Sequence, residues 1–190
     1  KNGKLNVNAD DAAEFYTIIQ NYANLTVEDM TLDGTYLDKW SRTDGDSYVL
    51  SNNSGNVLIK GNTHIVANDE GDKAFAFDAC NYQGYVAPIV TVETTGHIAG
   101  LIESTATIVI KNGTYTMDVT EWCAEGLTAE PAEVAGAVIY TIVTGTTFID
   151  GQFTSYNNTQ DQVVEYIHYE RTFPADAWQA VYVPFEIPVS

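Results

Sequence analysis

Short extended segments recur along this chain, and their alternating pattern limits the folds that it can adopt. They are rich in Val, Ile, Thr and Tyr, with Asn, Gly and Asp between them, and they begin near residues 25, 57, 89, 108 and 147. Apolar side chains fall on one face of each segment and polar side chains on the other. The paired apolar positions are Leu25 and Val27, Val57 and Ile59, and Ile108 and Ile110. This period of two predicts strands with one side buried.

The segments also resemble one another in their order of residues. Each begins with two alternating apolar residues, followed by a charged residue, a kink of Asn, Asp or Gly, and a second short strand. The repeat is irregular, but its length is typical of solenoids, in which short units stack on their neighbours. Asn and Gly at the kinks allow left-handed corners, where Asn amides can stack from one unit to the next. We therefore expect the strands to stack as coils.

Three segments, NLTVEDMTLDG (24–34), NVLIKGNTHIVA (56–67) and TIVIKNGTYTMD (107–118), resemble coils of the pectin-lyase-like superfamily. The resemblance covers roughly residues 20 to 155. It implies an all-β fold, the right-handed parallel β-helix. We expect one β-helix domain over residues 1–160, with a polar loop at 38–46 and an Ala- and Glu-rich insertion at 118–136 that contains a helical turn.

The last residues follow a different pattern. Segments 163–173 and 178–187 alternate strongly on either side of a short loop, which predicts an antiparallel β-hairpin over residues 161–190. The pattern Tyr-x-Arg-Thr-Phe, followed by Trp-Gln-Ala-Val-Tyr-Val-Pro-Phe, resembles a segment of large surface proteins of gut Bacteroidetes. That resemblance implies an extracellular or cell-surface location in a bacterium, and a further, truncated module at the hairpin. An unpaired edge of the hairpin would also allow homo-oligomers to form.

The charge balance excludes several classes of partner. The chain has 26 acidic residues against 8 Lys and Arg, for a formal net charge of −18. Nucleic acid and anionic lipid surfaces both require a basic face, which these few cations cannot supply. No apolar run is long enough to span a bilayer, so we expect no membrane insertion.

The residues give little support for catalysis. A lyase of this superfamily needs a basic residue, and Lys60 and Lys111 occupy corresponding outward positions without a second cation to bind an acidic substrate. A glycoside hydrolase needs paired carboxylates held on a rigid face, but the one adjacent Asp pair, at 10–11, lies outside the repeats. The three histidines, His64, His97 and His168, lack the G-x-S-x-G motif of a serine nucleophile. We predict no catalytic residue and no cofactor.

Metal ligands are not evident either. Cys80 and Cys123 each lack a second Cys or a His at ligand spacing, and whether they form a disulfide stays open. The acidic loops 44–46 and 69–72 do not follow the EF-hand order, although calcium binding there stays open. We predict no metal site.

Aromatic residues in polar loops are the best candidates for ligand binding. Trp40, Tyr82 and Tyr85 lie in such loops. Flat aromatic faces suit sugar rings, although the same rings could instead pack over the ends of the coils. We therefore expect a non-catalytic, adhesin-like or glycan-binding module whose partner is a polysaccharide or host glycan. The alternatives are a structural spacer of a larger surface protein and a polysaccharide lyase or hydrolase.

Overall fold

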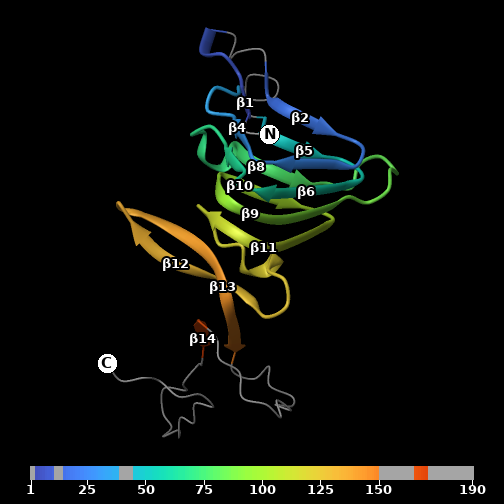
Figure 1. The fold of residues 1–190 in the computed structure, drawn as a ribbon. Coiled ribbons are helices and arrows are strands. Elements are labelled where there is room, and N and C mark those ends of the chain that lie inside the picture. The colour runs from blue at the N-terminus through green and yellow to red at the C-terminus, as the bar shows by residue number, and fades with distance from the viewer. Residues whose placement is uncertain (1–2, 11–14, 39–44, 150–164, 171–190) are drawn as a thin grey trace, which may run out of the picture.

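The computed structural model describes residues 3–10, 15–38, 45–149 and 165–170, and it is an all-β structure (Figure 1). The first strands are β1 (Gly3–Asn6), β2 (Thr17–Asn21), β3 (Leu25–Glu28), β4 (Met30–Asp33), β5 (Ser47–Asn52), β6 (Asn56–Gly61) and β7 (His64–Val66). The later strands are β8 (Ala74–Ala79), β9 (Ile89–Ala99), β10 (Leu101–Ser104), β11 (Thr107–Tyr115), β12 (Leu127–Val134), β13 (Ala137–Ile149) and β14 (Tyr166–Glu170). Two short 3-10 helices are η3 (Gly71–Lys73) and η4 (Thr120–Trp122). Within the described residues, no helix has the length and apolar character needed to cross a bilayer.

Strands that are far apart in the sequence lie side by side and parallel. β3, β6, the beginning of β9 and β11 pair in that order. The residues that lie opposite one another are Leu25, Val57, Val90 and Ile108. The segments predicted to begin near 25, 57, 89 and 108 are therefore neighbouring strands, and this part of the repeat is confirmed.

Two further sets of parallel strands complete the layers. β1, β4, β7 and the end of β9 form one set, and β2, β5, β8 and β10 form a separate four-stranded sheet. The strands thus recur in triplets, such as β2–β3–β4 and β5–β6–β7, and each triplet lies on the preceding one (Figure 1). We call each triplet with its turns a layer. β8 with β9 forms the third layer and β10 with β11 the fourth, and the long strands β9 and β11 each take the place of two strands.

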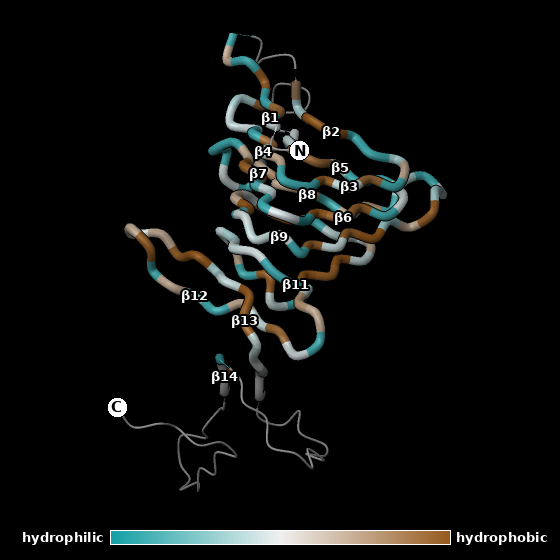
Figure 2. The backbone as a smooth tube through the Cα atoms, viewed as in Figure 1, coloured by the Kyte–Doolittle hydropathy of each residue, from teal (hydrophilic) through white to brown (hydrophobic). Residues whose placement is uncertain are grey.

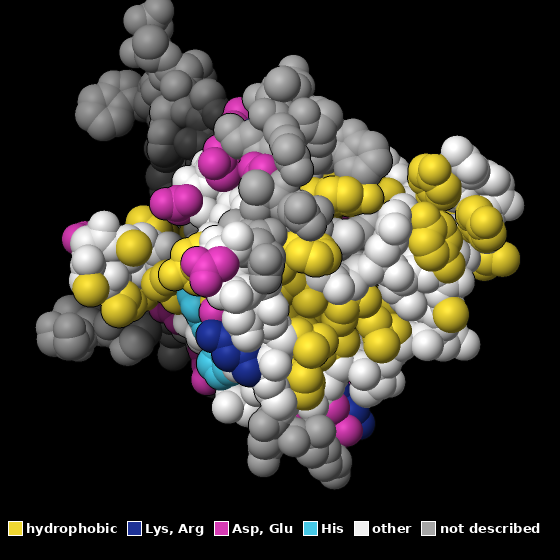
Figure 3. Space-filling model, turned by 90° about the horizontal axis from the view of Figure 1, so that it is seen from above, with side chains coloured by type: hydrophobic (Ala, Val, Ile, Leu, Met, Phe, Trp, Pro, Cys, Tyr) yellow, Lys and Arg dark blue, Asp and Glu magenta, His cyan; other side chains and the backbone are white. Residues whose placement is uncertain are grey.

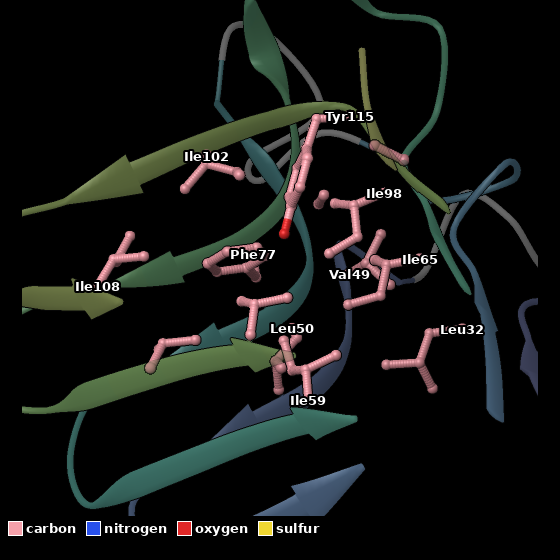
Figure 4. Close-up of a cluster of buried hydrophobic side chains, with 14 of the residues drawn as sticks. Leu32, Val49, Leu50, Ile59, Ile65, Phe77, Ile98, Ile102, Ile108 and Tyr115 are labelled. Carbon is pink, nitrogen blue, oxygen red and sulfur yellow. The ribbon is translucent and has the colours of Figure 1, made fainter. Parts of the chain in front are cut away.

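The core fills the space between these sets of strands. Leu32, Ile65, Ile98 and Tyr115 follow one another in register and are fully buried, and Figure 4 shows their side chains pointing into one cluster with Phe77. The Tyr115 hydroxyl donates a hydrogen bond to the Asn112 carbonyl at 2.9 Å, so this buried polar group has a partner. Figure 2 shows hydrophobic stretches recurring in successive strands, as the alternating pattern predicts.

Parallel pairing does not continue to the end of the described chain, and the sheets are mixed. β12 and β13 form an antiparallel hairpin, and β13 is also antiparallel to β11. Ala135 and Gly136 at the tip of the hairpin have φ angles of 52° and 84°. Two consecutive left-handed residues make the tight turn that suits antiparallel strands, so the chain reverses direction here. The all-β prediction is confirmed, whereas the strand pairing within residues 1–160 is mixed and not parallel throughout as a β-helix predicts.

Other expectations for this region have different outcomes. The predicted insertion 118–136 contains the helical turn, η4, but most of its second half is strand β12. The segment expected to begin a coil near 147 is the end of β13, which pairs in parallel with β14. The predicted partner strand 178–187 and the boundary at residue 160 lie outside the described residues, so the C-terminal hairpin stays a prediction.

Candidate functional site

The turns that join the four-stranded sheet to the next set of strands stack at one end of the molecule (right in Figure 1). These turns lie at 21–24, 52–55, 80–88 and 104–107, and we call them together the turn end. Backbone bonds link each turn to the next: Asn53 N–H to the Asn21 carbonyl (2.9 Å), Cys80 N–H to the Asn52 carbonyl (3.1 Å) and Thr105 N–H to the Ala79 carbonyl (3.0 Å). The turn end is therefore a continuous surface built from four segments that are distant in sequence.

Buried amides hold these turns in register. The Asn21 side-chain amide donates to Asn52 Oδ1 at 2.7 Å and to the Ser54 carbonyl at 3.2 Å. Asn21 and Asn52 are both buried, at 9% and 0% exposure, and each also donates to a carbonyl of its own turn, at Ala23 and Gly55. The Ser54 hydroxyl donates to the Val86 carbonyl at 3.0 Å and ties the next turn. Asparagine amides thus join successive turns at positions 21 and 52, not at the kinks where the sequence pattern placed them.

Close approach of two turns also requires a glycine. Gly55 has a φ of 81°, and a Cβ atom there would lie 2.4 Å from the Ala23 backbone. Gly84, in the following turn at 80–88, has a similar φ of 77°, but a Cβ atom there would meet nothing within 4 Å. The two glycines share the same backbone conformation and differ only in their surroundings.

We expect Gly55→Ala to lower the free energy of unfolding by about 3 kcal/mol, because left-handed strain of about 1–2 kcal/mol adds to the clash with Ala23. Gly84→Ala should cost only the strain, about 1 kcal/mol. Urea unfolding of both variants measures the difference. Equal losses in the two variants would show that the turns do not stack as closely as described.

Three exposed tyrosines form a cluster on this surface. The ring centroids of Tyr22 and Tyr85 are 5.5 Å apart, those of Tyr22 and Tyr82 are 6.3 Å apart, and those of Tyr82 and Tyr85 are 6.5 Å apart. The Tyr82 and Tyr85 rings are nearly parallel, at 12°, whereas Tyr22 is tilted from them by 68° and 57°. Their exposed fractions are 42%, 40% and 54% in chain order. We call Tyr22, Tyr82 and Tyr85 the tyrosine patch.

The local backbone explains why these rings meet. Gln83 and Gly84 both have positive φ, and the Tyr85 N–H donates to the Tyr82 carbonyl at 2.9 Å, so a tight turn brings the two rings to the same side. Tyr22 follows β2 and comes from the first layer. Desolvation among its neighbours, followed by the charges of the neighbouring tyrosines, raises the pKa of Tyr22. Figure 3, viewed from above, shows hydrophobic side chains gathered in separate groups, one of them at the right, on the side of the turn end.

The predicted binding residues are only partly brought together. Tyr82 and Tyr85 lie on the turn end and contact each other, whereas Trp40 lies outside the described residues. Tyr22 was missed, because its place beside Tyr82 depends on the register of layers about sixty residues apart in the sequence. The signal that points to it is the Asn-Tyr pair at 21–22, which matches the Asn-Tyr pair at 81–82.

The lysines considered for lyase chemistry each lie beside a carboxylate. Lys60 Nζ is 3.6 Å from Glu28, and Lys111 Nζ is 3.7 Å from Glu93. Strand pairing places Lys60 between Glu28 and Glu93, so charges alternate along this outer face. These carboxylates would repel an acidic polysaccharide, so the arrangement favours a stabilising role on the surface of the sheet.

The histidines in strands are engaged in a ladder across the layers. His97 N–H donates to His64 Nδ1 at 3.1 Å, and His97 Nδ1 lies 2.9 Å from the Thr114 hydroxyl. Burial, together with the neighbouring His64, lowers the pKa of His97. Both side chains thus make contacts expected of structural residues, and the side chain of His168 is outside the described part of the chain.

A polar group of three side chains lies at the ends of β8 and β10, next to the turn end. Ligand atoms of Asp78, Cys80 and Glu103 all lie within 4.8 Å of one another. Asp78 is 3% exposed and accepts hydrogen bonds from the Asn52 backbone and from the Ser51 hydroxyl at 3.3 Å. Thiolate and carboxylate ligands in such a group could hold zinc if the thiol lost its proton. Sequence spacing did not reveal it, because Asp78 meets Glu103 only through strand pairing.

Hydrogen bonds and a protonated thiol satisfy this polar group without a metal. Burial raises the pKa of Asp78, and burial together with the nearby Asp78 carboxylate raises the pKa of Cys80 to about 12. The Tyr48 hydroxyl donates to Glu103 Oε2 at 3.0 Å. Cys80 and Cys123 are both free thiols, so the two cysteines form no disulfide with each other. The hydrogen bonds assign this group to the support of the turn end.

Comparisons with family models, with curated proteins and with solved structures found no match. The function must therefore be argued from the geometry of the chain itself. Among the described surfaces, the tyrosine patch combines exposed rings with a backbone that is held in place, and it is the candidate binding site.

Proposed function

We propose that this chain is a non-catalytic module of the parallel β-helix class, located outside the cell or on its surface, which binds carbohydrate through the tyrosine patch. Triplets of parallel strands, stacked layer on layer around one core, support the β-helix class. The extracellular location rests on the sequence resemblance. The hairpin of β12 and β13 follows the stacked layers and ends their regular order.

The observation that carries the proposal is the exposure of three adjacent rings. Isolated exposed aromatic residues are common, but a group of them on a surface marks a place of contact with another molecule. A tyrosine ring offers an apolar face to the C–H groups of a sugar, and its hydroxyl can hydrogen-bond to the sugar hydroxyls. This mixture of apolar and polar contacts is what carbohydrate requires.

The surroundings of the patch also favour binding. Hydrogen bonds from Asn21, Ser54 and the Tyr82–Tyr85 turn hold the backbone beneath the rings. A surface that is already ordered loses less conformational entropy when a ligand binds, so more of the contact energy appears as affinity. A structural spacer would need the stacked layers but not these exposed rings.

We expect the double variant Tyr82→Ala/Tyr85→Ala to bind glycans at least about tenfold more weakly, because loss of two stacking platforms removes more than about 1.4 kcal/mol of binding energy. A glycan array identifies a ligand, and calorimetric titration of that ligand measures the loss. The matched control is Tyr36→Ala, since Tyr36 is 51% exposed and lies outside the patch.

Two results would contradict the proposal. Equal affinity in the double variant and in the wild type would remove the tyrosine patch from binding. Failure of the folded wild-type chain to bind any glycan would favour the structural spacer. Thermal unfolding of each variant should change little, because the substituted rings are exposed, and this confirms that any lost affinity is not lost folding.

A further inference from the structure

The turn end differs from the rest of the chain in its charge. The turn end and the residues beside it at 20, 25, 56 and 89 contain no Asp, Glu, Lys or Arg, although charged residues make up 18% of the chain. Their composition is dominated by Asn, Tyr, Ser, Thr, Gly and Ala. Antibody loops use a similar set, in which Tyr supplies contact area and Asn, Ser and Gly supply adaptable hydrogen bonds.

Positive charge is placed elsewhere. Each lysine of the described chain pairs with a carboxylate outside the turn end: Lys4 with Asp33, Lys60 with Glu28, Lys73 with Asp46 and Lys111 with Glu93. The charged groups nearest in sequence to the turn end are the carboxyls of Glu103, directly before the turn at 104–107, and Asp78, two residues before the turn at 80–88. An anionic ligand at the turn end would therefore meet no described counter-charge.

We infer that the tyrosine patch selects neutral oligosaccharides and rejects uronic-acid and sulfated glycans; this rests on the proposed function and gives its ligand class. An anionic sugar would approach a chain of net charge −18, and no cation of the described residues lies at the turn end to offset its desolvation. A neutral sugar loses nothing by that field. The exposed amides of Asn81 and Gln83, beside the two parallel rings, offer donors and acceptors that match sugar hydroxyls.

The spacing of the rings matches the size of one sugar unit. The patch extends from the first layer, which carries Tyr22, to the third, which carries Tyr82 and Tyr85. Centroid separations of 5.5 to 6.5 Å are on the scale of one pyranose unit. The tilted Tyr22 ring stands as a side wall against the two parallel platforms. The patch therefore has the size to hold one neutral sugar unit of an oligosaccharide.

The test compares neutral oligosaccharides with their uronic-acid and sulfated counterparts, using the full chain and calorimetric titration. We expect at least tenfold tighter binding of the neutral member of each pair, and less than a twofold change in its affinity when the ionic strength is raised tenfold. Gln83→Lys places a cation in the turn that carries the two rings. This variant should lower the ratio of neutral-glycan affinity to acidic-glycan affinity at least threefold, because it binds acidic glycans more tightly.

Ala132→Lys is the matched control, because it changes the net charge equally at an exposed position on β12, away from the turn end. It should leave the preference unchanged. Binding of acidic glycans as tight as that of neutral glycans, and lost in Tyr82→Ala/Tyr85→Ala, would overturn the inference and leave the proposed function standing. Absence of binding to either class by the folded chain would overturn the proposed function itself.

Discussion

Replacing Phe77 by alanine should lower the free energy of unfolding by about 3–5 kcal/mol, a large part of the stability of a single domain. Phe77 is fully buried in β8, and strand pairing places it between Leu50 of β5 and Ile102 of β10. Each of these neighbours belongs to a different layer. The cavity left by the ring would therefore weaken contacts across three layers, which cannot collapse around it without moving their strands.

Urea unfolding followed by circular dichroism measures this loss. The matched control is Phe15→Ala, because Phe15 is 48% exposed and the same substitution there should cost no more than about 0.5 kcal/mol. If the two variants had similar stabilities, Phe77 could not lie in the centre of the core.

Much of the stacked part could be predicted from local pattern alone. Alternation of apolar residues is a property of a few consecutive positions, so Val57 and Ile59 could be assigned to one buried face without knowledge of their neighbours. Similarity between segments then indicated which strands pair, and the register of Leu25 with Val57 agrees with it. Both signals come from the repetition of one short unit.

The reversal at β12 and β13 could not be predicted in the same way. Whether two strands pair in parallel or antiparallel depends on the connection between them, and here Ala135 occupies a left-handed position that alanine seldom adopts. The sequence around it, rich in Ala and Glu, favoured a loop or a helical turn. The alternating segment after it therefore looked like one more coil.

The candidate site was likewise predicted only where local sequence was sufficient. Tyr82 and Tyr85 were predicted because a Gln-Gly turn and polar neighbours surround them locally. Tyr22 and the pairing of Asp78 with Glu103 depend on contacts between layers, and single-chain pattern reasoning does not give the register of each turn. The uncharged surface likewise depends on stacking. A single turn without charges is common, and the four uncharged turns form one continuous uncharged surface only because they lie on one another.

The polar group beneath that surface leads to the second large effect. We expect Cys80 to react with iodoacetamide at least about a hundredfold more slowly in the folded chain than in urea, because only the thiolate is nucleophilic and its ordinary pKa is near 8.5. Burial raises the pKa of Cys80 to about 12 and that of Cys123 to about 11. Mass spectrometry of labelled peptides follows both thiols in one sample.

Asp78→Asn separates the two causes of this protection. It removes the carboxylate that accepts a hydrogen bond from the Cys80 thiol, but it leaves the burial, which is the larger cause. Labelling of Cys80 at mildly alkaline pH should therefore become severalfold faster without reaching the rate in urea, while Cys123 is unchanged, because Asp78 does not contribute to its pKa. Faster labelling of both thiols would mean that the substitution loosens the fold. An unchanged rate at Cys80 would mean that Asp78 does not face it, and the described support of the turn end would then be wrong.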